Sequence, residues 1–394
     1  MPEIAVVGGG ILGALSALLA ARRGWGVTLY EAEPALWSGA SSANEGKVHL
    51  GAVFALGDPA THEVMQRGAL TFAPLVEQAI GEEVDWAAIS TAPFDYLVMP
   101  ESLVTPEQLS RRYRRINQLF TRLSTELPFG YLGTRIDHVI DPRPFRDPQT
   151  GFPAFVTGER AVDPLALGRI VVDAVEQAGI EVRTGTRITR IGPDGPGAEL
   201  EATTPEGAAR FRADAVINCT WADQGKLLPT GAAPERNFRI KCAVRLAPIA
   251  DARTVTLVLG PFGDVVAHGD YTYASWYPEA RLTNEFGVVP SRHSDELLAA
   301  VASRSDVARR QLAALAEIGL LPADAEVLQA VGAVIVGHGR RDIHRRTSAL
   351  HRRDEFGARV DGAVVTPLNF KLTTAPAAAE FAVSAIARAV ELAS

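Results

Sequence analysis

The N-terminal residues 1–31 constrain the fold more than any other part of the chain. Residues 4–7 (IAVV) are a short β-branched run typical of a buried parallel strand. The pattern G-x-G-x-x-G follows at residues 8–13, a helix is predicted to end near Gly24, and a second strand, residues 26–31, ends on Glu31. The glycine pattern alone would be weak. Together, the strand, helix, second strand and terminal acid predict an α/β fold that binds an adenine dinucleotide.

Each feature of this fingerprint has a physical reason. Gly8 permits the tight turn from strand to helix, Gly10 lets a pyrophosphate approach the backbone, and Gly13 lets helix and strand pack closely. The helix N-terminus offers N–H groups to the phosphates, and the carboxylate of Glu31 can accept hydrogen bonds from ribose hydroxyls. A glycine-rich buried turn without a ligand is the alternative. The cofactor contacts predicted in this unit are Gly8, Gly10, Ile11, Leu12, Gly13, Glu31 and Ala32.

Composition limits the classes of protein to consider. With 394 residues, the chain is long enough for two domains, and its net charge of −7 argues against nucleic acid as a partner. Only two cysteines occur, Cys219 and Cys242, which excludes a disulfide framework or a cysteine zinc site and indicates a reducing, cytoplasmic compartment. No metal site is predicted. Residues 4–21 lack charge, but glycines interrupt them and no positive charge precedes them, so no membrane span is predicted.

The fingerprint does not choose between FAD and NAD. No second G-x-G-x-x-G occurs, because GHGRR at residues 337–341 lacks the third glycine. Flavoproteins that NAD(P)H reduces often need a second nucleotide site. A chain with one nucleotide-binding site and a large part of its length outside that site therefore indicates a flavin that the substrate reduces directly.

Four separated blocks resemble the FAD-dependent D-amino-acid-oxidase-like (DAO) superfamily, which includes glycine and sarcosine oxidases and the glycerol-3-phosphate and L-2-hydroxyglutarate dehydrogenases. They are the N-terminal fingerprint, residues 39–51 (GASSANEGKVHLG), residues 159–191 with 213–221, and residues 369–382 (NFKLTTAPAAAEFA). The blocks span most of the chain, and they are specific for the superfamily but not for a substrate. The resemblance implies FAD as the cofactor.

The resemblance also implies further cofactor contacts. Residues 41–47 are similar to the flavin loop after the second strand, and residues 371–374 to the loop at the pyrimidine end of the flavin. Cys219-Thr220-Trp221 stands where the family usually has a small pair, which makes the contacts there uncertain. These predicted contacts are Ser41, Ser42, Asn44, Glu45, Gly46, Lys47, Val162, Cys219, Thr220, Trp221, Lys371, Leu372, Thr373 and Thr374.

The intervening regions do not fit a nucleotide fold. Residues 105–127 and 294–319 read as helices, and residues 237–248 alternate as a half-buried antiparallel strand with Arg239, Lys241 and Arg245 on one face. The resemblance implies a mixed sheet that roofs the flavin. The predicted fold class is α/β, with a Rossmann-type FAD-binding domain and an inserted α+β substrate domain on a mixed or antiparallel sheet. The predicted FAD-binding domain comprises residues 1–81, 150–230 and 340–394, and the substrate domain residues 82–149 and 231–339.

The catalytic candidates come from three regions. Tyr271 and Tyr273 share one strand face that either lines the substrate pocket or is an aromatic core. The family places an arginine for the substrate carboxylate in the region of Arg340, Arg341, Arg345 and Arg346; of these, Arg345 and Arg346 are favoured, with a solvated basic hairpin as the alternative. Lys371 would lie beside the flavin. His49 is a base, a packed structural histidine or a covalent flavin anchor.

The sequence thus predicts an FAD-dependent oxidoreductase, either an oxidase or a dehydrogenase. Hydride passes from a CH–OH or CH–NH carbon of a small polar substrate to flavin N5, and oxygen or another acceptor reoxidises the flavin. His49 tilts the balance slightly toward a hydroxyl substrate. The alternatives are an NADPH-dependent flavin monooxygenase, although that family's second FAD motif is missing, and a non-catalytic dinucleotide-binding sensor. The sequence names neither the substrate nor the oligomeric state.

Overall fold

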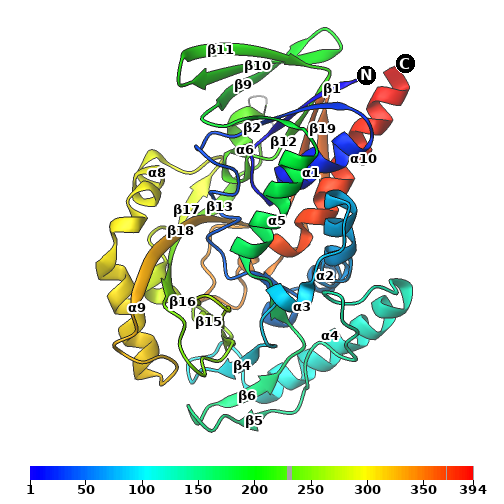
Figure 1. Cartoon of the computed structure of the whole chain (residues 1–394). Coiled ribbons are helices and arrows are strands. Elements are labelled where there is room, and N and C mark those ends of the chain that lie inside the picture. The colour runs from blue at the N-terminus through cyan, green and yellow to red at the C-terminus, as the bar shows by residue number, and fades with distance from the viewer. Residues whose placement is uncertain (229–232, 370, 394) are drawn as a thin grey trace.

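A six-stranded sheet carries the nucleotide-binding fingerprint. The computed structural model describes residues 1–228, 233–369 and 371–393. Strand β1 lies between β2 and β12 and pairs with both in parallel, so the strand order reverses at β1 (Figure 1). In spatial order, the strands of this sheet are β19 (Gly357–Asp361), β20 (Val364–Leu368), β12 (Ala215–Asn218), β1 (Glu3–Val7), β2 (Gly26–Tyr30) and β8 (Glu181–Arg183). Ligands of open α/β sheets bind at the carboxyl ends of the strands next to such a reversal.

Helices cover one face of this sheet, and a small antiparallel sheet covers the other. Residues 11–20 of α1 are all buried, which explains why this segment carries no charge. No helix among the described residues is long and apolar enough to cross a membrane. Helices α1 (Ile11–Arg22) and α10 (Ala375–Ala393) pack against the strands, and α2 (Pro59–Ile80) and α5 (Pro164–Gln177) pack against α1. The small sheet consists of β9 (Arg187–Asp194), β10 (Gly197–Thr204) and β11 (Gly207–Ala213).

A nine-stranded sheet forms the other half of the molecule. Most of its pairs are antiparallel, but β14 and β4 are parallel, so the sheet is mixed. In order, its strands are β17 (Glu285–Gly287), β13 (Arg236–Leu246), β16 (Thr272–Trp276), β15 (Gly263–Ala267), β14 (Val255–Val258), β4 (Asp95–Val98), β6 (Pro153–Val156) and β5 (Phe145–Arg146), with β18 (Val327–Gly337) paired to β13. The predicted fold class, α/β with a Rossmann-type domain and a mixed second sheet, is confirmed.

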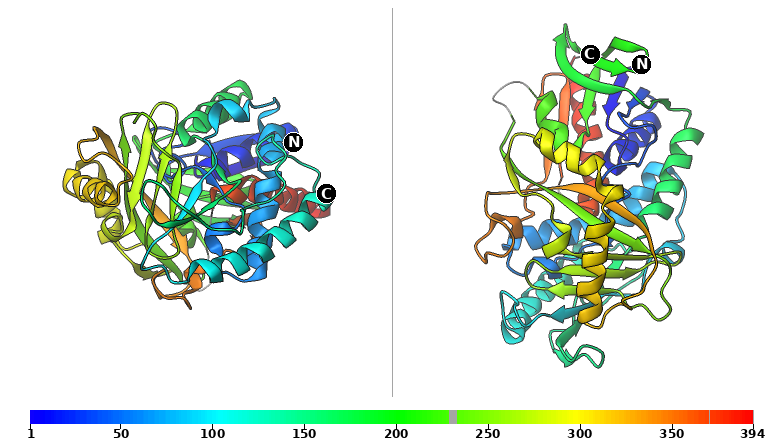
Figure 2. Two further views of the ribbon diagram at one scale, coloured as in Figure 1. Left: turned by 90° about the horizontal axis from the view of Figure 1, so that it is seen from below. Right: turned by 90° about the vertical axis from the view of Figure 1, so that its left-hand side faces the viewer.

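Helices α8 (Arg292–Ala299) and α9 (Ser305–Glu317) lie on the outer side of the nine-stranded sheet (Figure 2). Helix α4 (Pro106–Glu126) lies at the far end of the molecule from both termini (Figure 1). The short elements are α3 (Trp86–Ile89), α6 (Gln224–Leu227), α7 (Tyr277–Ala280), η1 (Ala52–Phe54), η2 (Trp221–Asp223), η3 (Val301–Ser303), η4 (Ala349–His351), η5 (Leu372–Thr374), and the strand pair β3 (Lys47–Val48) and β7 (Arg160–Ala161).

Two predicted elements are divided in the structure. Residues 180–191 (IEVRTGTRITRI) read as one strand from the sequence, but Gly185 turns the chain with a φ of +62° and places β8 and β9 in different sheets. The predicted helix 294–319 breaks between α8 and α9. Val301 is buried there against Gly332 of β18, where an added Cβ would lie 2.6 Å from a Val301 methyl, and Arg304 leaves the helical conformation. Tertiary packing therefore overrides local helix propensity at this point.

The domain division stays a prediction. The six-stranded sheet takes all its strands from the segments assigned to FAD binding. Strand β6, however, belongs to the nine-stranded sheet although its residues fall after the predicted boundary at residue 150.

Candidate flavin and active site

The glycine turn sits where β1, β2 and β12 end. The Gly8 N–H donates to the Tyr30 carbonyl over 2.8 Å, and the Cys219 N–H donates to Val7 over 2.8 Å, so three strand ends meet at one edge. Gly8 has a φ of +102°, and a Cβ on Gly13 would lie 1.7 Å from the Gly8 carbonyl oxygen. No other residue type fits either position, and the turn brings the N-terminus of α1 against the sheet edge.

The groups around this turn fit a dinucleotide. The Ser41 hydroxyl accepts a hydrogen bond from the Ile11 N–H over 2.9 Å, and a Cβ on Gly10 would lie 2.8 Å from that hydroxyl oxygen. The first turn of α1 holds no acidic side chain that would repel a phosphate. Glu31 accepts from the Gly9 N–H over 2.5 Å and from the Glu33 N–H over 2.8 Å, which fixes its carboxylate beside the glycines. Ala32 follows and is half-buried, and Leu12 is buried in the helix.

The loop at residues 41–51 has a fixed shape. The Asn44 amide donates to the Ser41 carbonyl over 2.9 Å, while its oxygen accepts from the Gly46 N–H over 2.7 Å. Gly46 has a φ of +77°, and a Cβ there would lie 1.9 Å from the Val162 carbonyl oxygen. The Val162 N–H in turn donates to the Gly46 carbonyl over 2.9 Å. Arg245 holds the loop from the other sheet, because its Nη2 donates to the Ser42 carbonyl over 2.6 Å.

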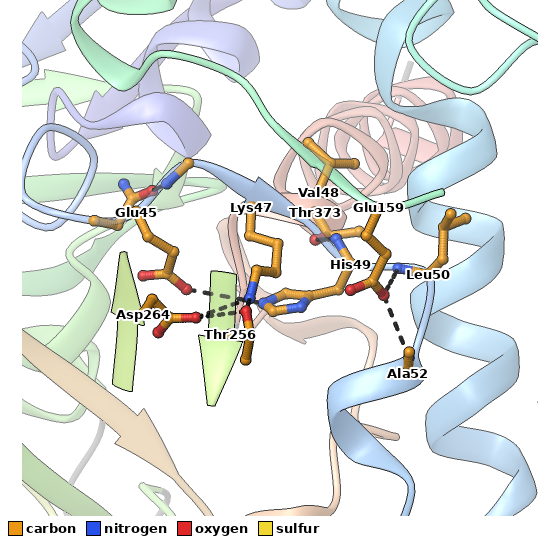
Figure 3. Close-up of polar contacts among 12 residues, drawn as sticks. Glu45, Lys47, Val48, His49, Leu50, Ala52, Glu159, Thr256, Asp264 and Thr373 are labelled. Atoms are coloured by element: carbon orange, nitrogen blue, oxygen red, sulfur yellow. Dashed lines mark hydrogen bonds and ion pairs between the residues drawn. The ribbon is translucent and has the colours of Figure 1, made fainter. Parts of the chain in front are cut away.

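Lys47 connects this loop to the nine-stranded sheet. Its side chain is buried, and Nζ lies 2.9 Å from a carboxylate oxygen of Asp264 on β15 and hydrogen-bonds Thr256 on β14 (Figure 3). Nζ also stands 4.0 Å from the centre of the Phe94 ring. Although burial alone would raise the pKa of Asp264, the cations of Lys47 and Lys241 hold it below its usual value. The Asp264 carboxylate is therefore ionised at neutral pH, and its contact with Lys47 joins the loop to the nine-stranded sheet.

Glu159 fixes the end of the same loop through hydrogen bonds to its backbone. This fully buried carboxylate accepts from the Leu50 N–H over 2.6 Å and the Ala52 N–H over 3.3 Å, and the Tyr96 hydroxyl donates to its other oxygen. Figure 3 shows it on the opposite side of His49 from Asp264. Burial raises the pKa of Glu159, and Lys47 and the hydrogen bonds oppose that rise. No local pattern in the sequence predicts this role for Glu159.

His49 is enclosed between the loop and the C-terminal return. Its ring is 3% exposed, and Nε2 lies 4.0 Å from a carboxylate oxygen of Glu45. Within the described parts of the chain, Nδ1 has no hydrogen-bond partner. Burial lowers the pKa of His49 well below 6.5, and Lys371, Lys47 and Arg353 lower it further. The imidazole is therefore neutral at neutral pH.

The return loop at residues 371–374 lies against His49. The Thr373 hydroxyl accepts from the His49 N–H over 2.8 Å, and the Thr374 hydroxyl donates to Asn369. Lys371 precedes η5, and Leu372 begins that short helix. Burial lowers the pKa of Lys371 to about 8; Glu45 opposes this shift, and nearby cations add to it.

Cys219, Thr220 and Trp221 follow β12. Cys219 is buried with Sγ 3.9 Å from the Ser16 hydroxyl, and burial raises the pKa of its thiol to about 12. The Thr220 hydroxyl donates to Asn218 over 2.6 Å. The Trp221 indole N–H donates to the Val334 carbonyl over 2.9 Å. Trp221 therefore reaches the nine-stranded sheet.

The two candidate tyrosines have different neighbours. Tyr271 precedes β16, and its hydroxyl donates to Asp163 at the start of α5 over 3.0 Å. Tyr273 is 2% exposed, and Nζ of Lys241 stands 5.8 Å from its ring centre. Burial raises the pKa of Tyr273 to about 12, so this hydroxyl stays protonated. The charged neighbours of Tyr273 include Glu45 of the flavin loop and Asp264, the ion-pair partner of Lys47.

The candidate arginines lie apart from this cluster. Arg345 and Arg346 are both exposed. Arg345 lines a surface pocket with Arg341 and Asp342, and Arg346 lines another with arginines of α4. Arg340 is exposed and pairs with Glu235. Their role at a substrate carboxylate stays a prediction.

Three cations near Lys371 come from other positions. Arg239 and Lys241 lie on β13, where Arg239 is buried and Lys241 is half-buried, although the alternating pattern predicted only a half-buried strand; Arg353 follows η4. Arg239 is 3% exposed and Arg353 is 4% exposed. The regular spacing of cations on residues 239–245 was the signal that could have identified the first two. Arg353 stands in a stretch rich in arginine, which gave no means of choosing it.

A family model described as FAD dependent oxidoreductase (DAO) matches residues 3–335. The chain belongs to the DAO family of FAD-dependent oxidoreductases. It is thus a flavoprotein enzyme with FAD as its cofactor, and the glycine turn and its flanking loops are the part of this DAO protein that fits FAD. Membership in this family also argues against a non-catalytic sensor.

Solved structures share the fold at low sequence identity. Glycine oxidase from Geobacillus kaustophilus is 16% identical with a TM-score of 0.66, covering 98% of this chain and 95% of its own. Iminodiacetate oxidase from Chelativorans sp. BNC1 is 17% identical with a TM-score of 0.62, covering 98% and 95%. L-alpha-glycerophosphate oxidase from Mycoplasma pneumoniae, with FAD bound, is 16% identical with a TM-score of 0.63, covering 98% and 94%. No curated protein matches the chain by sequence.

Proposed function

We infer that this DAO protein oxidises a small polar substrate at a carbon bearing a hydroxyl or an amine. The observation that carries the proposal is the enclosed, charged site around His49, at the edge of the sheet that holds the glycine turn. When bound, FAD would supply the hydride acceptor, its N5, and oxygen or another acceptor would reoxidise it. The neighbouring structures include oxidases of amino compounds and of a glycerophosphate, which supports both substrate classes.

His49 would take the proton that leaves the hydroxyl or amine. Its imidazole is neutral at neutral pH, and its Nδ1 has no partner within the described residues, so one nitrogen can accept a proton. Lys47, Lys371 and Arg353 disfavour the imidazolium that results. An anionic substrate beside these cations would offset them and make His49 a stronger base. An alcohol needs such a base more than a neutral amine does, so His49 favours a hydroxyl substrate slightly.

Lys371 and Tyr273 would orient the reacting groups. With a pKa of about 8, Lys371 is mainly protonated at neutral pH and would stabilise negative charge beside the flavin. Tyr273 keeps its hydroxyl proton and can donate it to a substrate oxygen. Tyr271 already donates to Asp163, so it would act by fixing the start of α5. Cytoplasmic location and a small-molecule substrate remain parts of this proposal.

A substrate panel tests the function. The FAD-loaded protein is mixed anaerobically with amino acids, N-methyl amines, 2-hydroxy acids and polyols, and the flavin band near about 450 nm is followed. We expect one class to bleach the band, and release of ammonia or a primary amine identifies an amine substrate. No bleaching by any class would refute the proposal. Acid precipitation then tests whether the flavin is covalently attached to His49, because flavin released to the supernatant excludes a covalent bond.

A further inference from the structure

The guanidinium groups of two buried arginines lie near the same residue, Gly337, beside the candidate active site. Arg239 comes from β13, and Arg353 follows η4. A Cβ atom on Gly337, at the end of β18, would lie 3.7 Å from Nη2 of Arg239 and 4.0 Å from Nη1 of Arg353. Burial, with the charge of Arg239, lowers the pKa of Arg353 to about 9. The two guanidinium groups therefore lie close enough to repel each other.

Neutral groups are the hydrogen-bond partners that hold these arginines in place. Nη1 of Arg239 donates to the Tyr277 hydroxyl over 3.1 Å, and Nη1 of Arg353 donates to the carbonyls of Leu350 over 2.7 Å and Arg352 over 2.5 Å. Within residues 1–228, 233–369 and 371–393, Nε of each arginine has no hydrogen-bond partner.

The nearest acid on the Arg239 side is engaged elsewhere. Asp342 accepts from the Tyr277 hydroxyl over 2.7 Å, and its other oxygen lies 3.3 Å from Nε of Arg281. Its charge is therefore matched by Arg281. Buried cations without a carboxylate partner are costly, and a bound anion would remove that cost.

Arg353 shares a neighbour, the Phe54 ring, with Lys371 and His49. The Phe54 ring lies 5.3 Å from the Arg353 guanidinium carbon, 5.7 Å from Nζ of Lys371 and 5.1 Å from the His49 ring centre. None of these residues belongs to the glycine turn or to α1, which fit the pyrophosphate. An anion at the arginine pair would therefore be a group of the substrate and not of the cofactor.

The charged groups that neighbour His49, Lys371 and the arginine pair call for more than one negative charge. The cations among them are Lys47, Arg239, Lys241, Arg353 and Lys371, and the carboxylates are Glu45, Glu159 and Asp264. The cations outnumber the carboxylates, and the protonation of Glu159 would widen the difference. A monoanion would leave a buried positive charge uncompensated.

We propose that the substrate is a dianion and that Arg239 and Arg353 together bind its anionic end. This inference rests on the proposed function, because it names the substrate class of that same site. Two planar guanidinium forks suit either the oxygens of a phosphate ester or those of a dicarboxylic acid. Both sources share the same chemistry, a compact group of oxygens with two negative charges.

Unreactive anions test the site without turnover. The FAD-loaded protein is titrated at constant ionic strength with malonate, sulfate and acetate, and the change in the flavin absorption spectrum gives each dissociation constant. We expect malonate or sulfate to bind about tenfold or more tightly than acetate. Tighter malonate indicates a dicarboxylic substrate, and tighter sulfate indicates a phosphate ester. Acetate binding as tightly as both dianions would overturn the proposal.

Variants assign the site to the arginines. Arg239→Gln and Arg353→Gln should each weaken binding of the preferred dianion by about tenfold or more, with the FAD content unchanged. Arg292→Gln removes the same charge from a side chain that is 92% exposed and should leave the dissociation constant unchanged. If Arg353→Gln does not fold, Arg353→Lys keeps the charge and removes the fork. Parental affinity in both Arg239→Gln and Arg353→Lys would overturn the assignment.

This test and the substrate panel can fail separately. If the dianions bind as expected and no hydroxyl or amine compound bleaches the flavin, the proposed function is wrong and the anion site stands. If a neutral substrate bleaches the flavin and the dianions do not bind, the oxidation is correct and the dianion is wrong.

Discussion

Replacement of Glu159 tests how the loop at His49 is held. This carboxylate is fully buried and accepts from two backbone N–H groups, those of Leu50 and Ala52, and from the Tyr96 hydroxyl. In Glu159→Ala, these donors are left in a cavity without an acceptor. Unsatisfied buried donors cost about 1–3 kcal/mol each, and the loss of a buried charged partner costs about 3–5 kcal/mol in total.

The isosteric change should cost much less. In Glu159→Gln, the amide oxygen can still accept from the backbone, and its NH2 group can donate to Tyr96. Burial raises the pKa of Glu159, which means that the folded protein tolerates its neutral form better than water does. We therefore expect Glu159→Gln to cost only about 1 kcal/mol.

Thermal unfolding of the FAD-loaded protein measures both effects. For a chain of 394 residues, Glu159→Ala should lower the melting temperature by roughly 4–6 °C, and Glu159→Gln by roughly 1 °C. Glu206→Ala, at an exposed hairpin turn, is the control and should not change it. A melting temperature of Glu159→Ala equal to that of the parent would refute the loop-anchoring role. Equal losses in both variants would show that the charge, and not its acceptor geometry, stabilises the loop.

Four further predictions concern the loop, the base and pH. Gly46→Ala forces a side chain into a φ of +77° and 1.9 Å from the Val162 carbonyl, so it should lower stability by more than about 1 kcal/mol and reduce the FAD retained per protein, measured by absorbance. His49→Asn should slow anaerobic flavin reduction by roughly 10²–10⁴-fold with FAD still bound. Because the pKa of His49 lies well below 6.5, the parental rate should be constant from about pH 6.5 to 8, fall at lower pH as His49 gains a proton, and fall above pH 8 as Lys371, whose pKa is about 8, loses its proton; an acid limb above 6.5 would contradict the assignment. Burial lowers the pKa of His268 to about 4, so the unfolded chain binds a proton below pH 6.5 that the folded chain does not, and stability falls between about pH 6.5 and 4 by up to roughly 3 kcal/mol. Urea unfolding of His268→Phe should show a flatter loss, and an unchanged pH dependence would contradict this.

The nucleotide-binding half could be predicted because its chemistry is local. Gly8, Gly13 and Glu31 lie within one strand–helix–strand unit, where spacing alone fixes the turn, the packing and the acid at the strand end. The same holds for α5, because Asp followed by Pro is typical of a helix start: Asp163 accepts from the Leu165 N–H over 2.8 Å, and Pro164 occupies the first turn.

The charged site could not be derived in the same way, because its parts meet only through the tertiary fold. Arg239, Glu159 and Arg353 lie on three distant segments, and local spacing assigns none of them its role in the site. The alternation in residues 237–248 predicts a strand and shows which side chains share a face. It does not show whether the face with the cations lies toward the protein interior or toward solvent. That side depends on the packing of β13 against β16 and β18, which a single sequence does not reveal.

The exposed positions of Arg345 and Arg346 illustrate the same limit. Their region contains many arginines, and sequence favoured two that the structure places on the surface. Arg353, seven residues beyond Arg346, is buried because the chain turns inward through η4, where the Arg353 N–H donates to Thr61 on α2. Composition identifies a basic segment, and only the path of the backbone decides which guanidinium enters the core.

An anaerobic titration of the FAD-loaded protein with a single bleaching substrate tests the central claim most directly. The account predicts that about one equivalent of a hydroxy or amino compound bleaches the flavin band without any pyridine nucleotide and yields an equal amount of carbonyl or imine-derived product. Bleaching by NADPH alone, with no carbonyl product from any compound of the panel, would contradict the account.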